Sequence, residues 1–144
     1  YTPEMVVNGR VGFVGSRRAQ AEQEISKALA QPASADVQIV SANAMPGGNV
    51  SVMVHIRGAN ASDRVVAALA QREIEHHVGA GENSGRTLHH AEVVRGLVTA
   101  PVRDGNVQLS LRAPADLTRG KGSVVIFVQV PRTLAITGAA RIDI

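Results

Sequence analysis

An alternation of apolar and polar side chains, which recurs along much of the chain, constrains the fold most strongly. Between residues 50 and 57, Val50, Val52, Val54 and Ile56 alternate with Ser51, Met53, His55 and Arg57. Successive side chains of a β-strand point to opposite faces of a sheet, so this period of two predicts a strand with one buried face. The same period recurs at Val37 and Ile39, and again from residue 107 to residue 111.

Turn-forming residues separate these runs at short intervals. The turns predicted in this way are Pro46-Gly47-Gly48, Asp104-Gly105-Asn106 and Gly120-Lys121-Gly122. Short alternating strands joined by such turns are typical of an antiparallel β-sandwich. The nearly continuous apolar run from Val124 to Val130 predicts a central strand that is covered on both faces.

The composition limits the chemistry that this chain can perform. Tyr1, Phe13 and Phe127 are the only aromatic residues, so the core must be built from aliphatic side chains, among which Val favours strands. The net charge of +3 comes mostly from scattered arginines without interleaved aromatics, a pattern that argues against nucleic-acid binding. The absence of Cys excludes a disulfide, a thiolate metal site and thiol redox chemistry within these residues. No apolar stretch reaches the ~18 residues that would span a bilayer.

The N-terminal segment predicts a β-hairpin followed by a helix. Asn8-Gly9 lies between two short apolar runs, and this pair favours a type I′ turn because both central residues of that turn need a positive φ. Ser16 is the predicted N-cap of a helix from Arg17 to Ala30. One face of that helix is predicted to carry Ala21, Ile25, Ala28 and Leu29. Pro32 ends it, and residues 32–35, PASA, are predicted to form a linker.

The segment from Asp63 to Glu75 has two readings. Its composition favours a helix capped by Ser62, because Ala, Leu, Gln, Arg and Glu are all good helix formers. Its neighbours favour a strand, since a glycine-rich loop at residues 79–85 would connect it as a hairpin to the run from Thr87 to Ala100. The residues alone leave both readings open.

Five histidines raise the hypothesis of a metal site: His55, His76, His77, His89 and His90. If the two runs pair as strands, one histidine of each adjacent pair could join Glu82 or Glu92 around zinc or copper. Adjacent residues of a strand point to opposite faces, however, and no H-E-x-x-H spacing is present. We therefore predict no metal site and no cofactor.

The loop between these two runs is the most polar cluster in the sequence. Glu82, Asn83 and Arg86 predict a recognition loop that could bind a partner. The alternative is a structural turn, in which Gly81 and Gly85 supply positive φ and Glu82 pairs with Arg86 or Arg95. The structural turn is the favoured reading.

Four stretches together resemble a known family. They are YTPEMVVNGR at residues 1–10, VGS at 14–16 with the helix that follows, GENSGRTLHHAEVVRGL at 81–97, and VVIFVQ with TGAARIDI between residue 124 and residue 144. In these stretches the chain resembles the secreted, thioredoxin-like bacterial family catalogued as domain of unknown function 1223. The resemblance extends over essentially the whole chain.

The resemblance implies a mostly β architecture in two parts. Residues 1–31 would be the C-terminal hairpin and helix of a thioredoxin-like α/β fold, and residues 35–144 an antiparallel β-sandwich. It also favours the strand reading for the segment from Asp63 to Glu75. By the same resemblance the protein is extracytoplasmic, either periplasmic or secreted.

The resemblance further implies a role for Thr2 and Pro3. In thioredoxin-like folds a residue before a cis-proline lies beside the active-site sulfurs and binds a thiol substrate, which here would be a protein. The alternative is a trans proline that begins an edge strand, where no N–H is needed. The family's Cys-containing motif does not occur in these residues, so thiol-disulfide redox would belong to an upstream thioredoxin-like segment of a longer parent protein.

Two further expectations complete the sequence reading. One alternative function is a β-sandwich binding module with no catalytic role. The other expectation is self-association of the chain through exposed strand edges, which present unpaired N–H and C=O groups.

Overall fold

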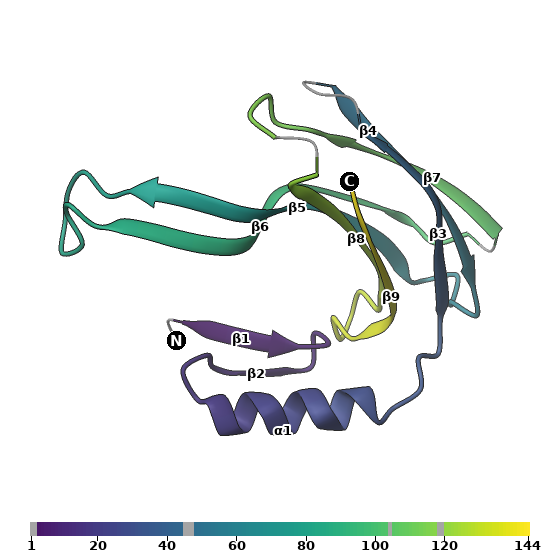
Figure 1. The fold of residues 1–144 in the computed structure, drawn as a ribbon. Coiled ribbons are helices and arrows are strands. Elements are labelled where there is room, and N and C mark those ends of the chain that lie inside the picture. The colour runs from purple at the N-terminus through teal and green to yellow at the C-terminus, as the bar shows by residue number, and fades with distance from the viewer. Residues whose placement is uncertain (1–2, 45–47, 104, 118–119) are drawn as a thin grey trace.

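A computed structural model describes residues 3–44, 48–103, 105–117 and 120–144. Within these ranges the elements are β1 (Glu4–Val7), β2 (Val11–Val14), α1 (Arg18–Leu29), β3 (Asp36–Ala44), β4 (Asn49–Arg57), β5 (Arg64–His77), β6 (Thr87–Pro101), β7 (Gly105–Arg112), β8 (Gly122–Gln129) and β9 (Ile136–Asp143). Pro46, Gly47 and Asp104, which belong to predicted turns, lie outside the described residues. Figure 1 shows the arrangement of the elements.

The strands form three antiparallel sheets. β1 and β2 form a hairpin, β3-β4-β7 form a three-stranded sheet, and β6-β5-β8-β9 form a four-stranded sheet. The prediction of a mostly β, antiparallel chain is therefore confirmed. The ambiguous segment is a strand from Arg64 onward, because β6 and β8 pair with β5 on either side and this tertiary pairing overrides its helix propensity.

The two larger sheets share one hydrophobic core. Every second residue of β4 is fully buried, at Val50, Val52, Val54 and Ile56, as the alternation predicts. These side chains belong to the same cluster as Leu69 of β5, Leu111 of β7 and Ile126 of β8. Full burial of an aliphatic side chain of this size is worth about 1.5–3 kcal/mol, so the cluster stabilises this part of the chain without disulfides or aromatic residues.

β8 is a central strand with two different faces. Val124, Ile126 and Val128 point into the core and are fully buried. Val125 and Phe127 point to the opposite face and remain partly exposed. The prediction that this strand is covered on both faces is correct for its inner face alone. On its outer face Val125 and Phe127 remain partly exposed, because no described element covers them fully.

The N-terminal hairpin has the predicted turn. Asn8 and Gly9 have φ values of 49° and 67°, and the Arg10 amide donates to the Val7 carbonyl over 3.0 Å. Both central residues thus have the positive φ that a type I′ turn requires. Phe13 of β2 is buried, and α1 packs against β1 of the hairpin.

α1 differs from its prediction at both ends. It begins at Arg18, and its N-cap position is Arg17, which makes no side-chain capping hydrogen bond. Ser16 is therefore not the cap, because the turn that leaves β2 extends one residue further. Ala21 is buried against the hairpin, whereas Leu29 is 81% exposed. The predicted apolar face of the helix exists, but only its first part is covered.

The connection from α1 to β3 is fixed to the four-stranded sheet. The amides of Ser34 and Ala35 both donate to the Thr137 carbonyl, at 3.0 and 3.1 Å. Ala35 is buried and belongs to the core cluster. The prediction of a linker at residues 32–35 is therefore wrong for Ala35, which packs as part of the sheet region.

Candidate functional site

We refer to β1, β2 and α1 together as the N-terminal layer. Pro3 stands at the open end of its hairpin, where it is exposed and its carbonyl oxygen accepts a hydrogen bond from the Gly15 amide over 2.7 Å. Thr2, the other predicted substrate-binding residue, lies outside the described residues. The substrate-binding role of Thr2 and Pro3 therefore stays a prediction.

The opposite end of the hairpin attaches the N-terminal layer to the rest of the molecule. The Asn8 carbonyl accepts a hydrogen bond from the Ile136 amide over 2.9 Å. Gly9 lies so close to the carbonyl group of Leu134 that a β-carbon there would collide with it. Beside this junction, a groove of about 380 Å³ lies between α1 and β9. The layer is thus held at one end by a turn rather than by extensive helix-to-sheet packing.

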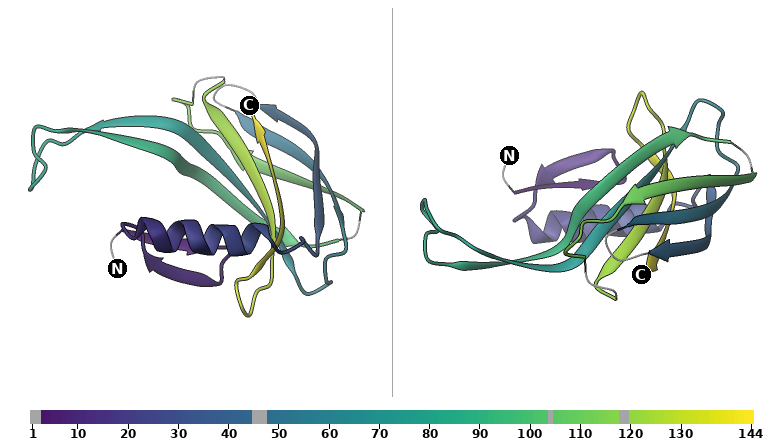
Figure 2. Two further views of the ribbon diagram at one scale, coloured as in Figure 1. Left: turned by 60° about the horizontal axis from the view of Figure 1, so that its bottom comes forward. Right: turned by 90° about the horizontal axis from the view of Figure 1, so that it is seen from above.

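A two-stranded arm projects from the four-stranded sheet. β8 pairs with β5 only as far as Gln71, whereas β5 and β6 remain paired out to His77 and Thr87. We call residues 72–92 the arm, since Val93 pairs with Gln71 at its base. The arm and the N-terminal layer extend in the same direction from the two larger sheets (Figures 1 and 2), and the arm reaches further.

The histidines of the arm lie on both of its faces. In the register of the strands, His76 pairs with Leu88 and His90 with Ile74, whereas His77 pairs with Thr87 and His89 with Glu75. The closest contact joins His89 Nδ1 to Glu75 Oε1 at 3.3 Å. Among the described residues, no group of three or more His, Cys, Asp or Glu side chains could hold a metal ion.

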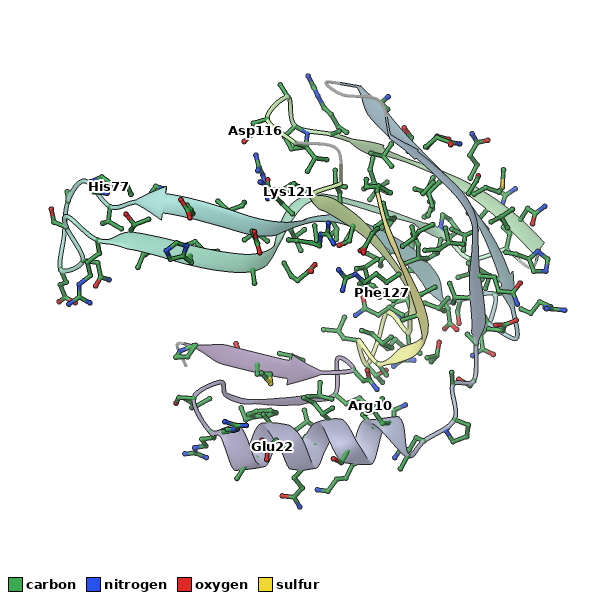
Figure 3. All side chains as sticks on the ribbon, in the orientation of Figure 1. Arg10, Glu22, His77, Asp116, Lys121 and Phe127 are labelled. Atoms are coloured by element: carbon green, nitrogen blue, oxygen red, sulfur yellow. The ribbon has the colours of Figure 1, made fainter. Side chains whose placement is uncertain are left out.

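The loop at the tip of the arm exposes the predicted recognition residues Glu82, Asn83 and Arg86. Backbone hydrogen bonds order the loop, including one of 2.8 Å from the Gly85 amide to the Val78 carbonyl. Gly81 and Gly85 have φ values of 90° and 80°, as the structural reading of this loop requires. The figures place the loop far from the N-terminal layer (Figure 3), so it is not a packing contact with that layer.

One ion pair expected for the loop is not formed. Arg95 lies at the base of the arm rather than near its tip, and its guanidinium group bonds both carboxylate oxygens of Asp116, at 2.8 and 3.0 Å. The same guanidinium group also donates to Gln71. The pairing of Glu82 with Arg95 is therefore wrong, because the length of the arm separates the two residues.

The base of the arm is fixed by charged side chains. Arg72 pairs with Asp143 at 3.4 Å. Glu92 has a φ of 52° and directs its carboxylate to the Ser123 hydroxyl at 3.2 Å and to Arg141 at 2.9 Å. Together with Arg95, these contacts attach both strands of the arm to the sheet and set its direction.

The carboxyl group of Asp116 has a pKa below its ordinary value. The hydrogen bond from Arg95 lowers the pKa of Asp116 against the opposing effect of desolvation, and a bond to its own backbone and the positive charge of Arg95 add to the lowering. Sequence reasoning missed this pair, since the two residues are distant in sequence and Arg95 is positioned by a β-bulge between Val94 and Gly96.

The outer face of the four-stranded sheet, directed away from the three-stranded sheet, is mainly apolar. Three rows cross it in register: Leu97, Ala68, Val125 and Arg141; Val94, Ala70, Ser123 and Asp143; Thr99, Val66, Phe127 and Ala139. Leu97 is 63% exposed and Val94 is 56% exposed. Sequence reasoning did not single out this face, although the adjacent pairs Val93-Val94 and Leu97-Val98 carried a signal, because such pairs place apolar groups on both sides of a strand.

Comparison with known families identifies the chain. The model of the family described as "Protein of unknown function (DUF1223)" matches residues 1–129. The chain belongs to the DUF1223 family. A search of curated proteins finds no match.

The family match covers the N-terminal layer, the three-stranded sheet, and β5, β6 and β8 of the four-stranded sheet, whereas β9 lies beyond the matched residues. The arm of this DUF1223 chain thus lies within the matched residues, whereas the segment from Leu134 to Ile136, which contacts Asn8 and Gly9, lies beyond them. Among its described residues, no helix is both long and apolar enough to cross a bilayer.

Proposed function

We propose that this DUF1223 chain is the non-catalytic, C-terminal part of an extracytoplasmic thioredoxin-like protein, whose thioredoxin-like fold it completes with β1, β2 and α1. In this proposal residues 35–144 form a β-sandwich that supports the completed fold. Any thiol-disulfide chemistry belongs to the remainder of the parent protein, since this chain has no Cys. Thr2 and Pro3 would flank the thiol protein substrate.

One observation carries the proposal. Among the described residues, β1 pairs with β2 and with no other strand, so its second edge presents unpaired N–H and C=O groups. A two-stranded hairpin is at most marginally stable by itself in water, and an unpaired edge is a template for another strand. A thioredoxin-like remainder would supply that strand. The exposed Ile25 and Leu29 of α1 support the same reading, because they leave an apolar helix face to be covered.

Hydrogen exchange tests the proposal. We expect the β1 amides that point away from β2 to exchange rapidly in the 144-residue chain and to be protected at least tenfold in the parent polypeptide. Protection in the parent would support strand addition at β1. Equal exchange in both would contradict it.

The redox part of the proposal needs a separate measurement. The parent polypeptide should reduce a protein disulfide, and the 144-residue chain should not. A parent that contains paired cysteines yet remains inert would contradict the thiol-disulfide assignment.

A binding module with no catalytic role is a second candidate function. It is favoured by the exposed tip loop, where Glu82, Asn83 and Arg86 stand at the end of a braced arm. Under this proposal, replacing Glu82 and Arg86 by Ala should weaken capture of a protein partner at least tenfold without changing stability. Substitution of Gln108, on the distant three-stranded sheet, is the matched control.

A further inference from the structure

Beyond its base the arm is acidic at neutral pH. At the base, Arg72 pairs with Asp143 and Glu92 with Arg141, so these charges belong to the contact with the sheet. The other charged groups of the arm are three carboxylates and one guanidinium group, all exposed: Glu73, Glu75, Glu82 and Arg86. With neutral imidazoles they carry a net charge of −2, whereas the whole chain carries +3. The arm therefore differs in sign of charge from the body that it projects from.

Arginines surround the end of β5 that lies opposite to the arm. β5 begins at Arg64, which pairs with the last residues of β6 and β8. Arg103 lies two residues beyond the end of β6, and Arg132 lies in the connection from β8 to β9. The hairpin turn that carries Arg10 contacts the same connection. We call these four exposed arginines the arginine end.

Few carboxylates oppose the arginine end. Asp36 is paired with Arg57 at 3.4 Å. Asp63 is only 2% exposed and accepts a hydrogen bond from the Asn60 amide over 3.0 Å. Asp104 lies outside the described residues, and its charge is smaller than that of the four arginines together. This end of the sheet therefore presents an excess of positive charge.

Four exposed histidines lie among the carboxylates of the arm: His76, His77, His89 and His90. The carboxylate of Glu75 faces His89 Nδ1 at 3.3 Å. Glu73 and Lys121, which pair at 3.8 Å, line the same hollow as His89 and His90. Glu92 directs its carboxylate to Ser123 and Arg141 instead. Across the two strands, the residues opposite the remaining histidines are uncharged: Leu88, Thr87 and Ile74.

Protonation of these histidines reverses the charge of the arm. Imidazole groups bind protons as the pH falls from about 8 to about 5, whereas carboxylates remain mostly ionised over that range. Four added positive charges turn the net charge of the arm from −2 into +2. An arm that attracts the arginine end at neutral pH thus repels it at mildly acidic pH.

We propose that the arm binds the arginine end of a second copy of the chain at neutral pH and is released when its histidines are protonated. Charge complementarity selects this occupant, because each copy carries both an acidic projection and a basic end. The two surfaces lie at opposite ends of β5, and Arg10 and His77 lie far apart (Figure 3), so the contact joins different copies head to tail. Exposed ion pairs are weak and screened by salt, so the association is reversible. It requires neither a thioredoxin-like remainder nor a catalytic role.

Charge reversal of each surface tests the proposal. At about pH 7.5 and low ionic strength, sedimentation should show association of the 144-residue chain, which about 0.5 M salt weakens at least tenfold. Glu75→Lys with Glu82→Lys removes the acidic surface, and Arg64→Glu with Arg132→Glu removes the basic one. Each double variant should be monomeric, whereas an equimolar mixture should form a one-to-one complex through the two unaltered surfaces. The mixture associates only if both variants are folded.

Acidification tests the role of the histidines. The association should be lost at about pH 5.5, where imidazole groups are largely protonated. It should persist at that pH in the quadruple variant that combines His76→Gln, His77→Gln, His89→Gln and His90→Gln. His55→Gln is the control and should not protect the association, because His55 lies on β4 of the three-stranded sheet.

Four results would overturn the proposal. They are a chain that is monomeric at neutral pH and low salt, a mixture of the double variants that stays monomeric, an association that survives acidification, and an equal loss of association in a control double variant. That control is Arg17→Glu with Arg112→Glu, because both arginines are exposed and lie outside the two surfaces. Binding to vesicles of anionic lipid by chains that remain monomeric would identify a membrane as the partner of the arginine end instead.

Discussion

The two larger sheets have equivalent inner faces and contrasting outer faces. On the three-stranded sheet, the outer face carries polar cross-strand pairs: His55 Nδ1 lies 2.9 Å from Asn106 Oδ1, and Gln108 donates to the Ser51 hydroxyl over 3.3 Å. On the four-stranded sheet, the corresponding face carries Leu97 and Phe127. An antiparallel sheet with one polar face can stand in water, whereas one that is apolar on both faces calls for a second cover. The two sheets thus differ in what their outer faces present: polar pairs on one and mainly apolar side chains on the other.

The largest expected effect tests the equivalence of the inner faces. Leu69→Ala on the four-stranded sheet and Leu111→Ala on the three-stranded sheet should each lower the free energy of unfolding by about 2–5 kcal/mol, because each leaves a cavity in a packed core. Urea unfolding of the 144-residue chain measures this loss. Leu29→Ala is the matched control, since the same atoms are removed from an exposed site and should change the free energy by less than about 0.5 kcal/mol. Equal results for Leu69→Ala and Leu29→Ala would contradict the shared core.

A smaller effect concerns the position of the N-terminal layer beside the apolar outer face. Gly9→Ala should cost about 1–3 kcal/mol, because Gly9 has a positive φ and its β-carbon would meet the Leu134 carbonyl. Hydrogen exchange should accelerate in β1 and β2 while the core strands keep their protection. Gly79→Ala is the control, since nothing lies within 4 Å of a β-carbon at Gly79. Unchanged exchange in β1 would mean that the turn does not hold the layer.

A still smaller effect concerns the ion pair at the base of the arm. The pKa of Asp116 is lowered in the folded chain, so its pair with Arg95 contributes stability above the ordinary carboxyl pKa. That contribution is lost as the pH falls through the lowered pKa. Asp116→Asn should therefore reduce the acid dependence of the unfolding free energy, with little further loss on acidification. Arg95→Gln should give the same dependence of the unfolding free energy on pH as Asp116→Asn. If either variant keeps the pH dependence of the unsubstituted chain, the ion pair does not contribute to folding stability.

The smallest effect is expected on the polar outer face. Gln108→Ala removes one exposed hydrogen bond to Ser51 and should change the free energy of unfolding by less than about 0.5 kcal/mol. Thermal unfolding and light scattering together measure stability and association. A large loss, or a new oligomer, would mean that the polar face of the three-stranded sheet has a partner, and the contrast between the two sheets would no longer hold.

The parts of the fold that were predictable from sequence are those governed by local rules. The Asn8-Gly9 turn follows from the φ that both residues must adopt, and β4 follows from its period of two. The segment from Arg64 to His77 was not decided by local preference, because pairing with β6 and β8 makes it a strand.

The candidate site depends on long-range placement, which sequence periodicity does not encode. The register of β6 decides that Leu97 lies on the outer face, and a bulge between Val94 and Gly96 brings Arg95 to Asp116. The position of Ala35 likewise could not be predicted from its neighbours in the sequence. Its surroundings read as a linker, yet Thr137, far along the chain, fixes it to β9.

The junction between Asn8 and Ile136 has a consequence for biosynthesis. The hairpin is translated well before the segment that anchors it, from Leu134 to Ile136. The four-stranded sheet likewise needs β8, which follows β5 by more than forty residues, before β5 is paired on both sides. Contacts of such high sequence separation form slowly, and unpaired edges promote aggregation meanwhile. Until β8 and the segment from Leu134 to Ile136 are made, β5 therefore keeps an unpaired edge and the hairpin lacks its anchor.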